Sequence, residues 1–148
     1  MSHRFFFSQT PTEDTARLEG DEARHLTRVM RAKIGDTVEL FDGQGTSWTA
    51  TVQAIQRNHV SLRLDQKQSE TISNKPIITL AVALPKGDRQ KWLIEKITEL
   101  GTDSLVPLTT TRSVAEPTAA AISRLQRGVI ESCKQSGRNR LLEITQPQ

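Results

Sequence analysis

Hydrophobic positions between residues 4 and 64 predict short strands separated by turns. Residues 4–7 form an aromatic strand candidate, residues 37–41 and 47–55 alternate around a turn, and Val60, Leu62 and Leu64 recur with period two. The turn contains Gly43 and Gly45, which tolerate positive φ, so we interpret it as a hairpin turn and not as a phosphate-binding loop. Several short strands at this spacing are typical of a small barrel.

One helix is predicted within this part, from residue 21 to residue 31. Ala23, Leu26 and Met30 fall on one side of a helical wheel and face the barrel. The opposite side carries a row of cationic side chains, with His25 beside it: Arg24, Arg28 and Arg31. A solvated helix face is the simpler interpretation of this row, and a grip on phosphate is the functional one.

After a polar linker at residues 66–75 the pattern changes to alternating strands and helices. Residues 77–84 are almost continuously apolar, which predicts a strand buried on both faces. We expect helices at 88–100, with an inner stripe of Leu93, Ile97 and Leu100, and at 118–135, where Cys133 packs inside as a small hydrophobe. Strands at 104–108 and 141–144 complete a parallel α/β arrangement.

This α/β part is short for a complete doubly wound domain. Three strands and two helices leave an apolar sheet edge and face that no later residue of the sequence covers. We therefore expect that another subunit covers it or that the sequence is a fragment of a longer protein.

Composition fits a cytoplasmic globular protein. The chain has 148 residues, of which 35% are hydrophobic and 25% charged. No apolar run is long enough to span a membrane, and the N-terminus has no secretory pattern. A single cysteine excludes an internal disulfide, and three scattered histidines give no metal-ligand spacing, so no metal is expected.

The net charge of +3 is distributed unevenly. Residues 1–75 carry ten basic and ten acidic side chains, whereas residues 76–148 carry ten basic and seven acidic ones. A local basic excess attracts polyanions more strongly than the total charge suggests, so nucleic acid is a candidate partner.

Polar side chains also mark the predicted α/β part. Lys86 follows its first strand and Arg112 its second, where the carboxyl ends of parallel strands usually bind ligands. The second helix ends in a dense run of hydrogen-bond donors, Gln135, Ser136, Arg138, Asn139 and Arg140. Cationic capping of that helix is an equally good interpretation of the run as a whole, but it does not explain Gln135, Ser136 and Asn139 together.

Several separated motifs resemble the bacterial 16S ribosomal RNA (uracil-N3)-methyltransferase family. They cover the whole chain in the expected order: residues 21–31, 35–36, 40–43, 84–88, 95–101, 106–108, 112–114, 131 and 135–140. The first three resemble the PUA-like RNA-binding barrel of that family, and the others resemble its methyltransferase domain.

The resemblance implies a SPOUT-class enzyme, with a trefoil knot that holds S-adenosylmethionine. It implies a homodimer that methylates a uridine of 16S rRNA in the small ribosomal subunit. The fold is then α/β overall, with a PUA-like small β-barrel with one helix at 1–72 and the first part of a SPOUT-like parallel-sheet domain at 73–148. The family's glycine-rich cofactor segments would follow Gln148, so we expect this chain alone to be inactive.

The predicted RNA-binding set joins the residues above with Arg4 of the first strand. It comprises Arg4, Arg24, His25, Arg28, Arg31, Lys86, Arg112, Gln135, Ser136, Arg138, Asn139 and Arg140. No general base is assigned, because Glu95, Glu99 and Glu131 fit a helix face or a dimer interface equally well. The alternatives are a non-enzymatic RNA-binding module and a nucleotide-binding α/β protein unrelated to RNA.

Overall fold

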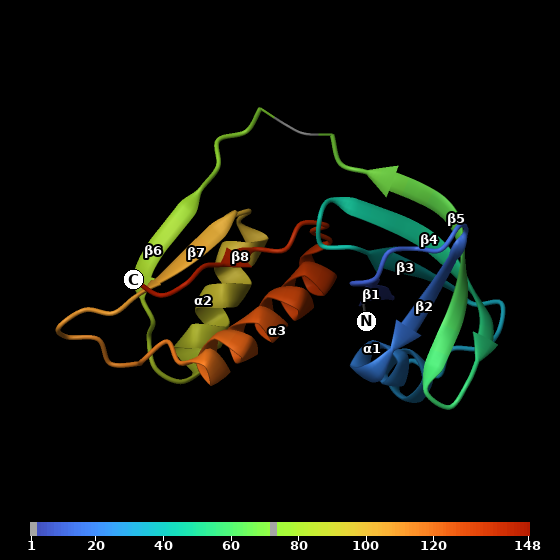
Figure 1. The fold of residues 1–148 in the computed structure, drawn as a ribbon, viewed down its shortest axis with the longest axis horizontal. Coiled ribbons are helices and arrows are strands. Elements are labelled where there is room, and N and C mark those ends of the chain that lie inside the picture. The colour runs from blue at the N-terminus through green and yellow to red at the C-terminus, as the bar shows by residue number, and fades with distance from the viewer. Residues whose placement is uncertain (1–2, 72–73) are drawn as a thin grey trace. The chain divides into compact units, whose positions relative to one another are not determined.

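The computed structural model describes residues 3–71 and 74–148, and the chain divides into two units, Met1–Thr71 and Ile72–Gln148 (Figure 1). Each unit is described by itself.

The first unit is a curled five-stranded sheet with one helical segment. Its sheet order is β1-β3-β4-β5-β2, with β1 parallel to β3 and the other pairs antiparallel. Register shifts at 49/50 and 52/54 in β4 help the sheet to bend. The strands are β1 (Arg4–Phe6), β2 (Thr15–Glu19), β3 (Thr37–Phe41), β4 (Thr46–Ile55) and β5 (His59–Ser69).

Two features of this sheet differ from the prediction. Strand β2 was not predicted, because only Ala16 and Leu18 in it are apolar, and they form too short an alternation to stand out. Strand β5 continues to Ser69 through the start of the predicted linker, since residues 66–69 pair with 46–49 of β4. Backbone hydrogen bonds hold this end of the strand although its side chains are polar and exposed.

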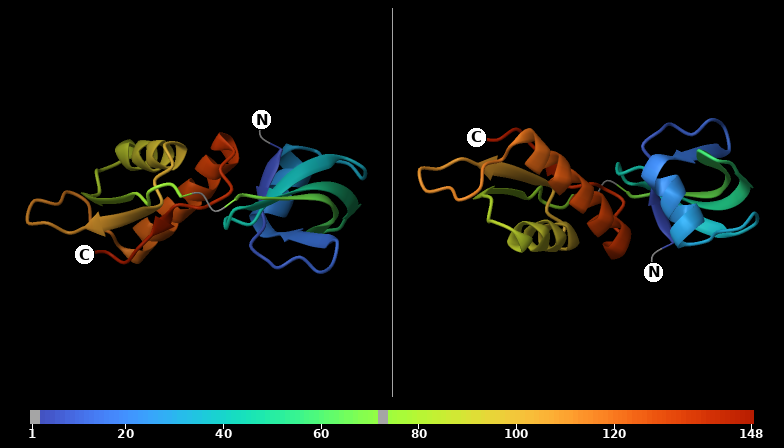
Figure 2. Two further views of the ribbon diagram at one scale, coloured as in Figure 1. Left: turned by 90° about the horizontal axis from the view of Figure 1, so that it is seen from above. Right: turned by 90° about the horizontal axis from the view of Figure 1, so that it is seen from below.

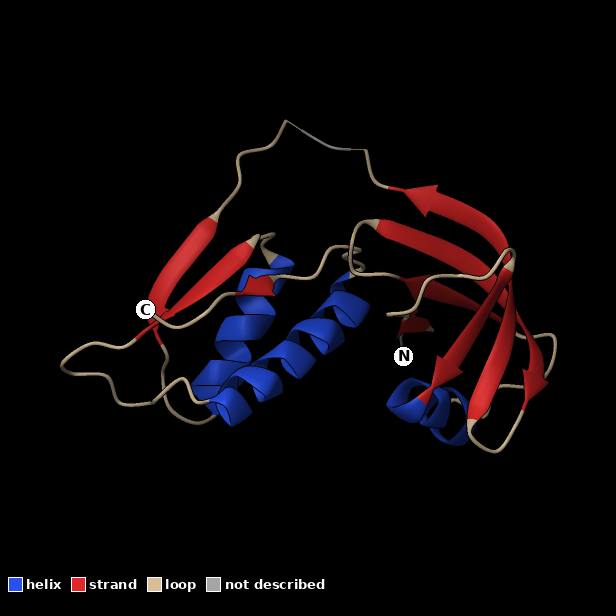
Figure 3. Ribbon diagram, viewed as in Figure 1, coloured by secondary structure: helices blue, strands red, loops and turns tan. Residues whose placement is uncertain are grey.

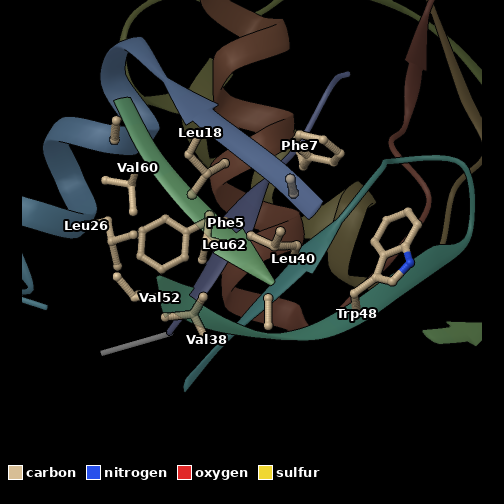
Figure 4. Close-up of a cluster of buried hydrophobic side chains, with 13 residues drawn as sticks. Phe5, Phe7, Leu18, Leu26, Val38, Leu40, Trp48, Val52, Val60 and Leu62 are labelled. Atoms are coloured by element: carbon tan, nitrogen blue, oxygen red, sulfur yellow. The ribbon is translucent and has the colours of Figure 1, made fainter. Parts of the chain in front are cut away.

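The core of the first unit lies inside the curl (Figure 4). Phe5, Leu40, Val60 and Leu62 are completely buried in it. Each such side chain stabilises the fold by about 1.5–3 kcal/mol relative to exposure. The cluster consists of Phe5, Phe7, Ala16, Leu18, Ala23, Leu26, Val38, Leu40, Trp48, Ala50, Val52, Val60 and Leu62.

The helical segment was predicted as one α-helix over 21–31, and its second half is different. An α-helix, α1 (Gly20–Arg24), passes into a π-helix, η1 (His25–Val29), in which Met30 N donates to His25 O. Ala23 and Leu26 face the core as expected. Arg31 lies beyond the helix with a φ of 52°, because the wider π turn ends the regular helical path before it.

The second unit is a three-stranded parallel sheet with both helices on one face (Figures 1 and 3). Figure 2 shows the same elements from above and from below. The predicted order of strands and helices is confirmed. The elements are β6 (Thr79–Ala83), α2 (Asp88–Glu99), β7 (Ser104–Leu108), α3 (Ala119–Ser136) and β8 (Glu143–Ile144).

The buried positions of this unit correct two predictions. The inner stripe of α2 consists of Gln90, Ile94, Ile97 and Thr98, whereas Leu100 follows the helix and is 80% exposed. Strand β6 is not buried on both faces: its residues are exposed or half-buried, because it is an edge strand and the helices cover one face.

Local signals set the ends of α3. The Thr118 hydroxyl accepts from Ala121 N at 3.2 Å and caps the start, and Gly137 ends the helix with a left-handed φ of 75°. Cys133 is buried, as predicted. The two helices pack closely at Gly128, where a Cβ would lie 3.4 Å from Ile94 Cγ2, in ordinary van der Waals contact.

No helix in the described part of the chain is long and apolar enough to cross a membrane. Among the same residues, no group of three or more His, Cys, Asp or Glu side chains is placed to hold a metal ion.

Candidate nucleic-acid interface

A polar hollow of about 460 Å³ lies on the first unit, between β2, the helical segment and the β4–β5 turn. Four of its lining side chains are arginines, and we call it the arginine hollow. Its lining residues are Arg17, Glu19, Gly20, Ala23, Arg24, Thr27, Arg28, Gln56, Arg57, Asn58, His59 and Val60.

Strand alternation and a tight turn bring these side chains together. In β2, Ala16 and Leu18 enter the core, so Arg17 and Glu19 face outward. Glu19 pairs in register with His59, at the start of β5. Gln56 N donates to His59 O at 2.9 Å, which closes the turn that carries Arg57.

The predicted arginine row only partly reaches this hollow. Arg24 and Arg28 line it, whereas Arg31, exposed beyond the π turn, does not. His25 is half-buried, and its ring meets the core ring of Phe5 edge-on at 5.6 Å between centroids. Of the four predicted helix residues, Arg24 and Arg28 therefore share the hollow, whereas His25 and Arg31 lie outside it.

Two of the four arginines in the hollow already hold acidic partners. Arg17 Nε lies 2.8 Å from Glu19 Oε1, and Arg17 Nη2 donates to His59 Nδ1 at 3.1 Å. Arg24 Nη2 lies 3.1 Å from Asp21 Oδ1.

The other two are Arg28 and Arg57. Within residues 3–71 and 74–148, neither guanidinium has a hydrogen bond or an ion pair.

Two other arginines of the first unit, Arg4 and Arg63, hold structural partners. Arg4 is buried, with its Nε 3.2 Å from Glu39 Oε1 and its guanidinium 4.6 Å from the Phe41 ring centre. Arg63 bonds Asp65 at 2.7 Å. The pKa of Asp65 is lowered, first by a hydrogen bond from the Thr51 hydroxyl and then by Arg63.

In the second unit, the predicted residues lie at opposite ends of the sheet. Lys86 and Arg112 are exposed in the loops at the carboxyl ends of β6 and β7. Helix α3 runs antiparallel to the strands over about 27 Å, estimated at 1.5 Å per residue. The run from Gln135 to Arg140 therefore lies at the amino ends of the strands, away from Lys86 and Arg112.

Arg138 shows what part of this run does. Its Nη1 donates to Thr98 O at 3.1 Å and to Thr102 O at 2.7 Å, which ties the end of α3 to one carbonyl in the last turn of α2 and one just after it. Ser136 also turns inward, since its hydroxyl donates to Ser132 O at 2.7 Å.

The carboxylates considered as general bases lie along the two helices. Glu95 and Glu131 line a groove of about 790 Å³ between α2 and α3, together with Gln135. Glu99 is bonded to Lys96 at 2.9 Å, and this bond raises the pKa of Lys96. None of the three lies at the carboxyl ends of the strands, so the structure gives none of them a catalytic position.

The hollow also contains residues that sequence reasoning missed, Arg17, Arg57, Asn58 and His59. Arg17 was missed because β2 itself was not recognised. Arg57 and Asn58 had a usable signal, since they form the polar connection between two predicted strands, and hairpin tips are common binding elements.

The fold and the hollow define a two-part protein in which a small barrel with a cationic surface precedes a parallel α/β unit. A family model described as an RNA methyltransferase domain matches residues 73–148, and one described as an RNA methyltransferase PUA domain matches residues 18–65. The chain belongs to this RNA methyltransferase family.

Named relatives agree with this assignment. Ribosomal RNA small subunit methyltransferase E of Synechocystis sp. is 34% identical over 135 residues, which are 91% of this chain and 44% of the relative. The Bacillus subtilis protein of the same name is 29% identical over 76% of this chain and 46% of its own length. The chain thus spans about half the length of the curated relatives it matches.

A solved structure supports the fold over nearly the whole chain. Ribosomal RNA small subunit methyltransferase E from Neisseria gonorrhoeae, bound to S-adenosyl methionine, superposes with a TM-score of 0.85 at 24% identity. The match covers 97% of this chain and 62% of that one. The predicted fold class, α/β overall with a PUA-like small barrel followed by a SPOUT-like parallel-sheet unit, is confirmed.

Proposed function

We propose that this chain is the RNA-binding and incomplete catalytic part of an S-adenosylmethionine-dependent methyltransferase. Its substrate is N3 of a uridine in 16S rRNA of the small ribosomal subunit, in the cytoplasm, and the enzyme works as a homodimer. Residues 1–72 form the RNA-binding barrel and residues 73–148 part of the methyltransferase domain. One observation carries the proposal: the barrel of an RNA methyltransferase family member bears a hollow lined by four arginines.

The chemistry explains why RNA must be held firmly. Uracil N3 lies on the Watson–Crick edge and carries a weakly acidic proton, so the base must be unpaired before it can react. Positioning of the base and removal of its proton are the main tasks. Arginines that grip the backbone fix the RNA in register and carry no base sequence information themselves.

Both units contribute to this RNA contact. On the barrel, Arg24 and Arg28 line the hollow, and Arg31 and His25 extend the surface beside it. On the α/β unit, Lys86 and Arg112 meet RNA at the carboxyl edge of the sheet. The predicted set is completed by Arg4, by Arg138 and by the polar side chains around Arg138, namely Gln135, Ser136, Asn139 and Arg140.

The polar side chains at the carboxyl edge of the sheet offer little for S-adenosylmethionine. The Ser113 hydroxyl accepts from Thr110 N at 2.7 Å, so it is already used within its own loop. Lys86 and Arg112 at the same edge are cations, which repel a sulfonium. We assign no residue of this chain to S-adenosylmethionine.

RNA binding is tested on the chain by fluorescence anisotropy with a labelled single-stranded RNA, between 50 and 200 mM salt. The test variant replaces Arg17, Arg24, Arg28 and Arg57 by Gln. The control replaces four cations outside the hollow, Lys33, Arg63, Lys67 and Lys75, so that the net charge changes equally. We expect a loss of about a hundredfold in the test variant and less than about fivefold in the control. Equal losses would mean that only total charge matters and would remove the hollow from the proposal.

Methylation is tested on the complete product of the gene, sequenced past the codon for Gln148. That product, incubated with small ribosomal subunits and labelled S-adenosylmethionine, is expected to form 3-methyluridine, and the 148-residue chain alone is expected to form none. A product that binds RNA but transfers no methyl group would support the non-enzymatic RNA-binding module instead.

A further inference from the structure

We propose that Arg28 and Arg57 form a two-point clamp for one RNA phosphate, while Arg17 and Arg24 only shape the hollow around it. This inference rests on the proposed function and assigns different roles within the same hollow. The clamp joins the helical segment, through Arg28, to the tip of the β4–β5 hairpin, through Arg57. These two arginines are 29 positions apart in the sequence.

Existing contacts separate the four arginines. Arg17 is held by Glu19 and His59, and Arg24 by Asp21 and by Gly20 O, to which its Nε donates at 3.3 Å. A phosphate would have to compete with these partners for the same donors. Arg28 and Arg57 have no partner among the described residues, so their donors are available without breaking a bond.

The two available guanidinium groups suit a phosphodiester. Each guanidinium presents planar N–H donors that match a pair of phosphate oxygens. Arg57 extends from a turn that the Gln56–His59 backbone bond keeps short. Arg28 extends from the π turn, where Thr27 Oγ1 donates to Ala23 O at 2.8 Å. The backbones of both residues are thus held in place, while neither guanidinium has a partner among the residues that the structure describes.

His59 also lines the hollow and contacts Arg17. A guanidinium can only donate, so His59 Nδ1, 3.1 Å from Arg17 Nη2, accepts this hydrogen bond. A hollow of about 460 Å³ with these donors is within the usual size range of small-ligand sites, about 300–1,000 Å³.

The experiment compares four single variants of the chain: Arg17→Gln, Arg24→Gln, Arg28→Gln and Arg57→Gln. Lys67→Gln, an exposed cation of β5 outside the hollow, is the control for the change in net charge. Affinities for uridine decamers and adenosine decamers are measured by anisotropy over a salt series, and circular dichroism checks the fold of each variant.

We expect Arg28→Gln and Arg57→Gln each to weaken binding about tenfold and to lower the salt slope by about 0.7. Arg17→Gln and Arg24→Gln, whose side chains line the hollow but already hold Glu19 and Asp21, should each weaken binding by less than about threefold, and Lys67→Gln should leave binding unchanged. The loss should be equal for the two RNAs, because a phosphate contact does not distinguish bases.

Different failures have different meanings. Equal losses for all four hollow variants, with Lys67→Gln unaffected, would overturn the clamp and leave the hollow as the RNA site. Losses limited to one of the two decamers would overturn the phosphate assignment in favour of base contacts. Absence of RNA binding by the unchanged chain would overturn the proposed function together with the clamp.

Discussion

The contacts of the arginines divide them into those bonded within the fold and those whose donors are available to a ligand. Arg4 is buried against Glu39 and Phe41, and Arg138 is bonded to two backbone carbonyls. Arg28 and Arg57 have no such partner in the described part of the chain. Arg4, Arg28 and Arg138 were all predicted to bind RNA, because position in the sequence reveals a charge but not what neutralises it.

Arg138→Gln is expected to destabilise the second unit by about 2–4 kcal/mol, because it removes two hydrogen bonds from a charged donor. Urea unfolding measures the effect. Arg112→Gln, which changes an exposed loop arginine, is the control and should stay within about 0.5 kcal/mol. An Arg138→Gln chain as stable as the control would show that the bridge between α2 and α3 contributes nothing.

At the scale of elements, secondary structure followed the local signals wherever these signals were strong. Thr118 and Gly137 fix the ends of α3, and Asp42 Oδ1 accepts from Gln44 N at 2.7 Å in the predicted hairpin turn. The π turn after Arg24 had no comparable signal. It changes which arginines reach the hollow, since a regular helix would have kept Arg31 in the row.

The cap of α3 gives a matched test at this scale. Thr118→Ala removes the hydroxyl that accepts from Ala121 N and should cost about 1 kcal/mol of unfolding free energy. Thr118→Ser keeps an acceptor at the same place and should be close to neutral. Equal stability of the Ala and Ser variants in urea would contradict the capping role.

For the whole molecule, total charge and local charge lead to different conclusions. Residues 1–75 have balanced charges, yet four arginines gather in one hollow on this unit. The basic excess of residues 76–148 is instead spread between the two ends of the sheet and a groove that also holds carboxylates. The net charge suggested that a polyanion binds residues 76–148. The arrangement of the cations instead favours residues 1–75.

The first unit should fold and bind RNA without the second. Its core consists of residues between Phe5 and Leu62, all within Met1–Thr71. We expect a fragment of residues 1–71 to keep its β spectrum by circular dichroism and to bind single-stranded RNA about tenfold more weakly than the whole chain, with a smaller salt slope, because the phosphate contacts of Lys86 and Arg112 are lost. A folded fragment with far weaker binding would show that the second unit supplies most of the contact.

The sequence by itself determined the order of elements, the change from period-two strands to alternating strands and helices, and the family. These features depend on local hydrophobic periodicity, capping residues and motifs, which are present within short stretches of chain. Tertiary structure alone decided which cations share a surface. Arg17, Arg28 and Arg57 meet because β2 pairs with β5 and the helical segment packs beside them, whereas Arg138 is turned inward by carbonyls 36 and 40 positions away. Such contacts depend on distances between segments remote in sequence, and no local pattern encodes them.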